Sequence, residues 1–182
     1  MMKKLISLIL CLLLIAVPVY GAQDAASLVE EATALLEAED YEAAIPVLEQ
    51  AADMGDAEAQ CFLGECYLQG EGVEQDYDKA MEYYQLAADQ GNGTALNNIG
   101  DMYEKGYGVE QDYEKALEYY NAAVEAGDPY GYWSLGSLYE KGYGVEQDYE
   151  KAAEYYRTAA DMGVQEAAED LDRLTEEGLI KR

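Results

Sequence analysis

The segment GYGVEQDYEKA occurs twice in this chain, at 106–116 and 142–152, and a close copy, GEGVEQDYDKA, occupies 70–80. Successive copies start 36 residues apart, since 106 − 70 and 142 − 106 both equal 36. A fixed period of this length is typical of solenoid proteins, in which each unit buries its apolar face only against its neighbours. The repeat therefore constrains the fold much more than it constrains the function.

Each unit predicts two helices joined by a loop with paired glycines. On the first helix, apolar and small residues recur at helical steps and form one core stripe. A glycine lies within this stripe, and we expect it to let two helix backbones approach closely. Asp76, Asp112 and Asp148 stand where an N-cap would begin each second helix. The fold class is therefore all-α, a solenoid of helix pairs. The expected first-helix core positions are Ala59, Ala95 and Gly131; Leu63, Ile99 and Leu135; Gly64, Gly100 and Gly136; Cys66, Met102 and Leu138; Tyr67, Tyr103 and Tyr139.

The chain begins with the layout of a secretory signal peptide. Lys3 and Lys4 precede an apolar run that ends at Val17, and Pro18 and the small Gly21 follow. The run is shorter than the roughly 20 residues that a membrane span needs. We therefore expect cleavage after Gly21 and export, to the cell envelope, the periplasm or the medium, with no membrane insertion after cleavage. An uncleaved N-terminal anchor is the alternative.

The expected domain boundaries follow from the repeat. Residues 1–21 are the signal peptide, and 22–56 are a degenerate first unit that lacks the glycine loop. Full repeats occupy 57–92, 93–128 and 129–164. A capping helix follows in 165–182, with Ala168, Leu171 and Leu174 as its apolar stripe.

The charge balance excludes some partners. Removal of Lys3 and Lys4 leaves 11 − 2 = 9 basic residues against 38 acidic residues, a net charge of −29. Such a charge opposes binding to nucleic acid or to an anionic membrane and favours basic partners or divalent counterions. Solubility alone is the simpler explanation of the charge.

No catalytic, cofactor or metal site can be recognised in the sequence. The chain has no histidine, and none of Ser27, Ser134 and Ser137 has a lysine three residues on. Cys61 and Cys66 lie five residues apart on one predicted helix, which disfavours an internal disulfide, and two thiols alone make a poor zinc site. We therefore expect no enzyme activity, no cofactor and no bound metal.

The repeat pattern resembles a known family. It reads Ala-x-x-x-Leu-Gly-x-x-Tyr, then Gly-x-Gly-Val-x-x-Asp-Tyr-x-Lys-Ala, and it closes with an aromatic-x-x-Ala-Ala. This pattern is similar to the Sel-one-like repeat family of the tetratricopeptide-like superfamily. The resemblance covers 57–164 in three units, and the flanking units match it loosely. It implies a right-handed superhelix of antiparallel helix pairs and an adaptor that assembles other proteins, which in bacteria is often exported or associated with the envelope.

Two departures from the family pattern stand out. Tyr83, Tyr119 and Tyr155 occupy a position where the family often has tryptophan. The cysteine-rich secreted branch staples each repeat with a disulfide, whereas this chain has two cysteines in one unit only. Membership of that branch, and the penicillin-binding or β-lactamase activity claimed for it, are therefore in doubt.

A second stripe on the first helices differs between copies and is the candidate partner-binding groove. The resemblance implies that first helices line the concave surface, and Tyr130 and Trp133 are the preferred anchor because aromatic residues dominate interface energies. Packing of Trp133 near the last repeat is the competing interpretation. The twelve groove positions are Glu58, Cys61, Phe62, Glu65, Thr94, Asn97, Asn98, Asp101, Tyr130, Trp133, Ser134 and Ser137.

We therefore expect an exported module that binds a protein or peptide in this groove. If Trp133 is an anchor, Trp133→Ala should leave folding intact and weaken partner capture. The alternative function is a cell-envelope enzyme or a protein that binds cell-wall carbohydrate, because tyrosines can stack on sugars. A third hypothesis is that the chain supports a larger complex through its ends.

Overall fold

The computed structural model describes residues 24–181. The predicted signal peptide and the first residues of the unit expected at 22–56 lie outside the described residues. Between residues 24 and 181 the chain forms nine helices and no strand, which confirms the all-α solenoid. Within the same range, none of the helices combines the length and the apolar character needed to cross a bilayer. The helices are α2 (Ala25–Glu37), α3 (Tyr41–Asp53), α4 (Ala57–Gln69), α5 (Tyr77–Ala88), α6 (Gly93–Lys105), α7 (Tyr113–Glu125), α8 (Pro129–Lys141), α9 (Tyr149–Asp161) and α10 (Gln165–Glu176).

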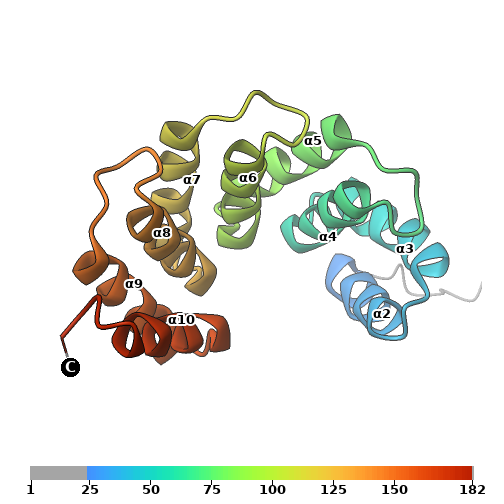
Figure 1. The fold of residues 1–182 in the computed structure, drawn as a ribbon. Coiled ribbons are helices and arrows are strands. Elements are labelled where there is room, and N and C mark those ends of the chain that lie inside the picture. Colours follow the sequence, from blue (N-terminus) through green and yellow to red (C-terminus); the bar gives the residue numbers. More distant parts are fainter. Residues whose placement is uncertain (1–23, 182) are drawn as a thin grey trace, which may run out of the picture.

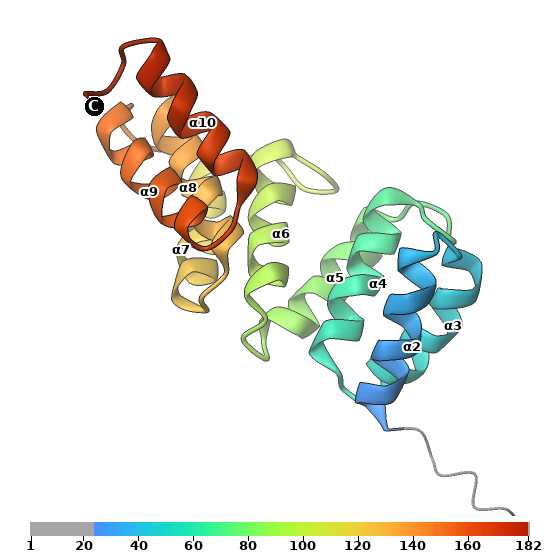
Figure 2. The ribbon, with the colours of Figure 1, turned by 90° about the horizontal axis from the view of Figure 1, so that it is seen from below.

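The helices pack in pairs along an arch. Helix α2 packs on α3, α4 on α5, α6 on α7 and α8 on α9, and each second helix also contacts the first helix of the next pair. Figure 1 shows α2, α4, α6, α8 and α10 along the inner curve of the arch, with α3, α5, α7 and α9 outside them. Seen from the open side in Figure 2, α2, α4 and α10 lie nearer the viewer than α3, α5 and α9. The first helices therefore form the concave layer.

Side-chain caps and glycines set the ends of the helices. The carboxylates of Asp76, Asp112 and Asp148 each accept a hydrogen bond of 3.0–3.1 Å from a backbone N–H in the first turn of α5, α7 and α9, as the sequence predicts. Gly70 ends α4 in the left-handed conformation, with φ at 78°, a backbone region that glycine enters at little cost. The three full repeats therefore start both helices, and end the first helix, at equivalent positions.

Three buried tyrosines explain the glycines of the core stripe. An added Cβ at Gly100 would lie 2.5 Å from the ring of Tyr120, and Gly64 and Gly136 stand in the same relation to Tyr84 and Tyr156. The expectation that these glycines bring two backbones together is therefore wrong, because the glycine instead makes room for a tyrosine ring from its own repeat. A close approach of two helix backbones is found instead at Gly131, where an added Cβ would lie 3.0 Å from the backbone nitrogen of Val124.

Two other details of the observed core differ from the prediction. In α10, Ala168 was predicted to be buried but is exposed, and Ala167 is buried in its place. The reason is that Ala167 and Leu174 face the apolar cluster that α10 forms with α9. Tyr103 and Tyr139 are only half-buried, in contrast to Tyr67. The rest of the predicted first-helix stripe is buried.

Candidate functional site

The candidate groove residues lie at matched positions on three consecutive first helices. Asp56, Asn92 and Asp128 cap α4, α6 and α8, and because these caps are 36 residues apart, equivalent side chains repeat along the concave layer. The twelve residues nevertheless differ in exposure. Glu58, Thr94 and Tyr130 are exposed; Phe62, Glu65, Asn98, Asp101, Trp133 and Ser137 are part-exposed; Cys61, Asn97 and Ser134 are buried. The structure therefore offers nine of these residues to a partner.

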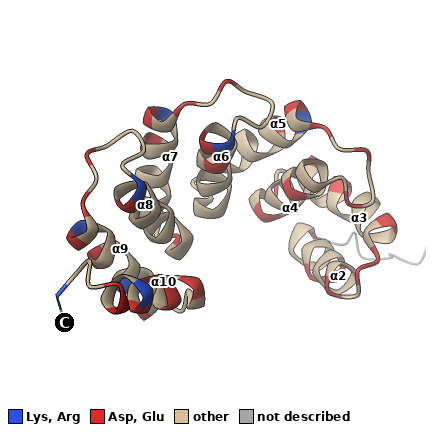
Figure 3. Ribbon diagram, in the orientation of Figure 1, with Lys and Arg blue, Asp and Glu red and all other residues tan. Residues whose placement is uncertain are grey.

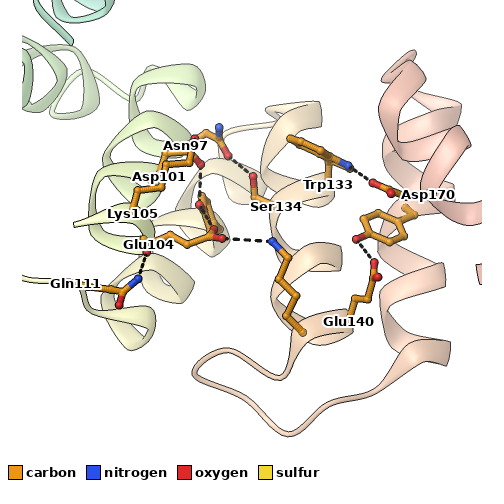
Figure 4. A network of polar contacts seen from close by, with 12 residues as sticks. Asn97, Asp101, Glu104, Lys105, Gln111, Trp133, Ser134, Glu140 and Asp170 are labelled. Carbon is orange, nitrogen blue, oxygen red and sulfur yellow. Dashed lines mark hydrogen bonds and ion pairs between the residues drawn. The ribbon is translucent and has the colours of Figure 1, made fainter. Parts of the chain in front are cut away.

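The buried members join neighbouring helices. The hydroxyl of Ser134 on α8 donates a hydrogen bond of 2.9 Å to Asn97 Oδ1 on α6, as Figure 4 shows. Cys61 is only 8 % exposed, and burial, together with the negative charges of Glu65, Asp128 and Glu58, raises the pKa of its thiol to about 12. These side chains form part of the contact between repeats, and the Cys61 thiol is poorly suited to nucleophilic chemistry because it stays protonated.

The groove carboxylates satisfy the hydroxyl groups of the buried tyrosines. Tyr84 donates a hydrogen bond of 2.8 Å to Glu65. The Tyr120 hydroxyl lies 2.7 Å from both Asp101 and Glu104, and it can donate its one proton to either. Burial raises the pKa of Tyr84, Tyr120 and Tyr156, and the nearby carboxylates raise it further. Glu65 and Asp101 therefore have a structural role in addition to any role in binding.

Ion pairs link the carboxylates around Tyr120 to neighbouring residues. Lys105 pairs with Asp101 one turn earlier on α6, and Lys141 reaches across from α8 to Glu104 at 3.7 Å. Figure 4 shows that these contacts form one network that spans α6 and α8. The two lysines offset the two carboxylates that share the Tyr120 hydroxyl, so this part of the concave face is close to neutral.

Trp133 is tied to the capping helix. Its indole N–H donates a hydrogen bond of 2.9 Å to Asp170 on α10, and its ring packs against the cluster that α9 and α10 bury. Arg173 continues this contact with bonds of 2.9 Å to both Asp170 and Glu140. Tyr130 meets the Trp133 ring edge-on, with centroids 6.5 Å apart, and stays 45 % exposed. Of the two predicted anchors, Tyr130 is the accessible one.

The charge on the arch is asymmetric. Residues 24–78 contain 16 acidic residues and no lysine or arginine, and Figure 3 accordingly shows red without blue on α2, α3 and α4. The ion pairs of the described residues all fall between Asp101 and Glu177. Residues 24–78 therefore carry negative charge with no basic residue of their own, whereas the later repeats combine both signs.

A hollow of about 500 Å³ opens at this N-terminal end. Aliphatic side chains of α2, among them Val29 and Ala34, form part of its lining, together with the carboxylates of Glu30, Glu37 and Glu58. Glu58 is one of the predicted groove residues. Its neighbours on α2 were not predicted, because the first unit matches the repeat pattern only loosely.

The described residues form no cluster of carboxylates and cysteines that could hold a metal. Both cysteines of this range are free and buried. One buried polar atom, Asp128 Oδ2, has no hydrogen-bond partner within the part of the chain that the structure describes. The predicted groove positions on the concave face thus carry polar and aromatic side chains.

Several residues of the concave network were missed from the sequence. Glu104 and Glu140 occupy equivalent positions, as do Lys105 and Lys141, and all four are charged residues on first helices. The predicted groove contains only positions at which the copies differ, and these four positions do not differ between the last two copies. The presence of the same charged residue at one position in two copies could have indicated these four residues. Asp170 and Arg173 could not be found by this route, because the capping helix has no full copy elsewhere in the chain.

The helix pairs and the concave layer define an α/α solenoid of the tetratricopeptide-like class. The Sel1 repeat profile matches residues 57–92, 93–128 and 129–164, so the chain belongs to the Sel1 repeat family. Proteins of this family generally mediate protein–protein interaction, and the repeat is typically a non-catalytic interaction scaffold. A comparison with curated proteins found no match.

Solved structures similar to this chain also include Sel1 repeat proteins. The chain is similar to a Sel1 repeat protein from Oxalobacter formigenes, with 30% identity, a TM-score of 0.75, and coverage of 83% of this chain and 63% of that one. It is similar to a protective antigen of uropathogenic Escherichia coli strains that displays an SLR fold, with 33% identity, a TM-score of 0.64, and coverage of 76% and 30%. It is also similar to Helicobacter pylori cysteine rich protein B, with 28% identity, a TM-score of 0.55, and coverage of 68% and 94%. The chain thus spans less than two thirds of the length of the first two proteins.

Proposed function

We propose that this protein is exported and acts as a binding module that holds a protein or peptide segment against its concave face. The observation that carries the proposal is the placement of Glu58, Thr94 and Tyr130. These three exposed side chains, of different chemistry, stand at one position of three consecutive first helices. The residues beside them are fixed by contacts between repeats, which gives a partner a preorganised surface.

The charge supports a basic partner. With a net charge of −29 after signal cleavage, the chain attracts basic surfaces and repels nucleic acid. The hollow beside Glu58 combines an aliphatic lining with three carboxylates. It fits the apolar stem and charged head of a lysine or arginine side chain. No step of this function requires catalysis, a cofactor or a metal. The export part of the proposal rests on the signal-peptide pattern in 1–21.

Affinity capture from the envelope and culture fluid of the native organism tests the proposal. The bait is the mature chain, and the test variant carries Glu58→Ala, Thr94→Ala and Tyr130→Ala, which alter exposed side chains only. The matched control carries Glu110→Ala, Glu146→Ala and Tyr143→Ala, which alter exposed loop residues. We expect a protein retained by the bait and the control and lost from the test variant. Equal capture by all three would contradict binding at the concave face.

A further inference from the structure

Two hollows lie on the convex side of the arch, away from the concave face that is proposed to bind a partner. The first helices α4, α6 and α8 contact one another in succession, whereas the second helices fan apart along the outer curve (Figure 1). The first outer hollow, of about 450 Å³, lies between α3 and α5 and includes Tyr67, Lys79 and Tyr83. The second outer hollow, of about 270 Å³, lies against α6 and α7 and includes the equivalent Tyr103, Lys115 and Tyr119. The same three side chains therefore line a hollow in two successive repeats.

The tyrosines of each hollow form a stacked pair with a lysine on one ring. The rings of Tyr67 and Tyr83 lie 5.7 Å apart and within 9° of parallel, and Lys79 Nζ is 4.7 Å from the Tyr67 centroid. In the next repeat the Tyr103 and Tyr119 rings lie 5.6 Å apart, and Lys115 Nζ is 4.8 Å from the Tyr103 centroid. A cation already rests on the inner ring of each pair. The outer rings, Tyr83 and Tyr119, are part-exposed and line the hollows.

Carboxylates surround the outer rings. Glu49, Asp53 and Glu82 line the first outer hollow with Tyr83, and Glu118 lines the second with Tyr119. None of these four carboxylates takes part in an ion pair of the described residues. In the first hollow Lys79 offsets one of three negative charges. Each outer hollow thus offers an aromatic ring and at least one carboxylate without an ionic partner.

The electrostatic surroundings of the tyrosines agree with this geometry. Burial raises the pKa of Tyr83, and Tyr67, Glu49, Asp53 and Glu82 raise it further. Burial also raises the pKa of Tyr119, with Tyr103, Asp89 and Glu118 as additional causes. The part of these shifts that comes from the carboxylates reflects a negative field, and such a field favours a cation beside the ring.

We propose that the two outer hollows bind arginine side chains presented by one extended partner segment. The guanidinium plane can stack on Tyr83 or Tyr119 while its N–H groups bond to the carboxylate beside the ring. The ammonium of lysine lacks both the plane and the paired donors. Leu86, which is 45 % exposed in the first hollow, suits the aliphatic stem of the arginine. The net charge, −27 for the whole sequence and −29 after signal cleavage, steers such a segment toward the protein.

The first test measures binding of defined peptides to the mature chain by fluorescence anisotropy. The probes are Gly/Ser peptides with two arginines at graded separations, and each has a counterpart with two lysines. We expect one arginine separation to bind at least 10-fold tighter than its lysine counterpart, which corresponds to about 1.4 kcal/mol. Equal affinity for the two peptides at every separation would mean attraction by net charge alone and would overturn the proposal.

Paired variants locate the binding. Tyr83→Leu with Tyr119→Leu removes the two outer rings, and Tyr107→Leu with Tyr143→Leu removes two exposed loop tyrosines that also stack on partners. We expect a loss of at least 10-fold for the first pair and less than 2-fold for the second. Equal effects of the two pairs would contradict the assignment. A second variant, Asp53→Asn with Glu82→Gln, removes two charges and keeps the shape of the first hollow. It tests the same site if the leucine variant fails to fold. We expect it to lower the affinity for the arginine peptide at least 5-fold.

A neutral oligosaccharide is the competing occupant of a tyrosine-lined hollow. Chitohexaose and cellohexaose are therefore titrated against the same set of variants. Arginine-peptide binding that neither sugar displaces supports the proposal. Sugar binding that depends on Tyr83 and Tyr119, with no binding of the arginine peptides, would reassign the hollows to carbohydrate.

Discussion

The indole nitrogen of Trp133 lies 2.9 Å from Asp170 Oδ2, and this hydrogen bond ties the last repeat to the capping helix α10. The bond uses the only donor of the indole, and the ring packs against the cluster that includes Val164 and Leu174. Trp133 is thus a structural contact at the end of the array, while Tyr130 beside it remains open to a partner.

Trp133→Ala should destabilise the protein. Loss of the ring removes part-buried apolar surface and takes the indole donor from Asp170 Oδ2, while Arg173 still bonds Oδ1. We therefore expect the free energy of unfolding to fall by about 2–3 kcal/mol. Urea unfolding followed by circular dichroism measures this change. Asp170→Ala keeps the ring but removes this hydrogen bond together with the 2.9 Å bond from Arg173, and it should cost about 1–2 kcal/mol. If Trp133→Ala leaves the unfolding midpoint unchanged, Trp133 does not stabilise the fold, and a role in partner binding would be favoured.

Gly100→Ala should clash with a buried ring. An added Cβ would lie 2.5 Å from Tyr120, whose side chain is fully buried and cannot move aside. We expect a cost of about 3 kcal/mol in unfolding free energy, at the upper end of ordinary overpacking effects. Gly91→Ala is the comparison, because that glycine has a φ of 82° and open space around it. Backbone strain alone should cost about 1–2 kcal/mol there. If the two variants cost the same, the ring contact is not what requires glycine at Gly100.

Stability should fall steeply in alkali. Burial raises the folded-state pKa of Tyr84, Tyr120 and Tyr156 above the unfolded value of about 10. Below pH 10 both states hold these protons, and above it only the folded state does, so rising pH favours unfolding. Three such groups give a slope of about −4 kcal/mol per pH unit above the unfolded pKa.

Urea titrations at several pH values between 8 and 11 check this slope. Burial, with Glu65 among the added causes, also raises the pKa of Cys61 to about 12 and that of Cys66 to about 11, so both thiols contribute from lower pH. A Cys61→Ala, Cys66→Ala background isolates the tyrosines. In that background Tyr120→Phe should reduce the steepness of the slope by about 1.4 kcal/mol per pH unit, the share of one titrating group. It should also cost about 2 kcal/mol at pH 7, since Asp101 and Glu104 lose their shared donor. A flat profile would show that the three hydroxyls ionise freely in the folded state.

The 36-residue period was sufficient to predict the helix pairs, because every repeat supplies the same caps, glycines and apolar steps. The side chain that a glycine accommodates was not predictable in this way. Gly100 meets a tyrosine ring from the second helix, and helical spacing within the first helix carries no information about that contact.

The candidate site was harder to predict than the fold. Variation between copies selected Glu58, Thr94 and Tyr130, which are exposed, and equally selected Asn97 and Ser134, which bond to each other in the interior. Residues at a boundary between repeats differ for reasons of packing as well as of binding. A pattern within one helix cannot separate the two, because the distinction depends on which neighbour each side chain meets.

Photo-crosslinking of the captured partner shows directly whether the concave face is where it binds. A photoreactive residue is placed at Thr94, which is exposed on the middle first helix, and at Glu110, which is exposed in the following loop. If the partner lies against the concave face, it should crosslink from Thr94 and not from Glu110. Crosslinking from Glu110 alone would contradict a concave binding face.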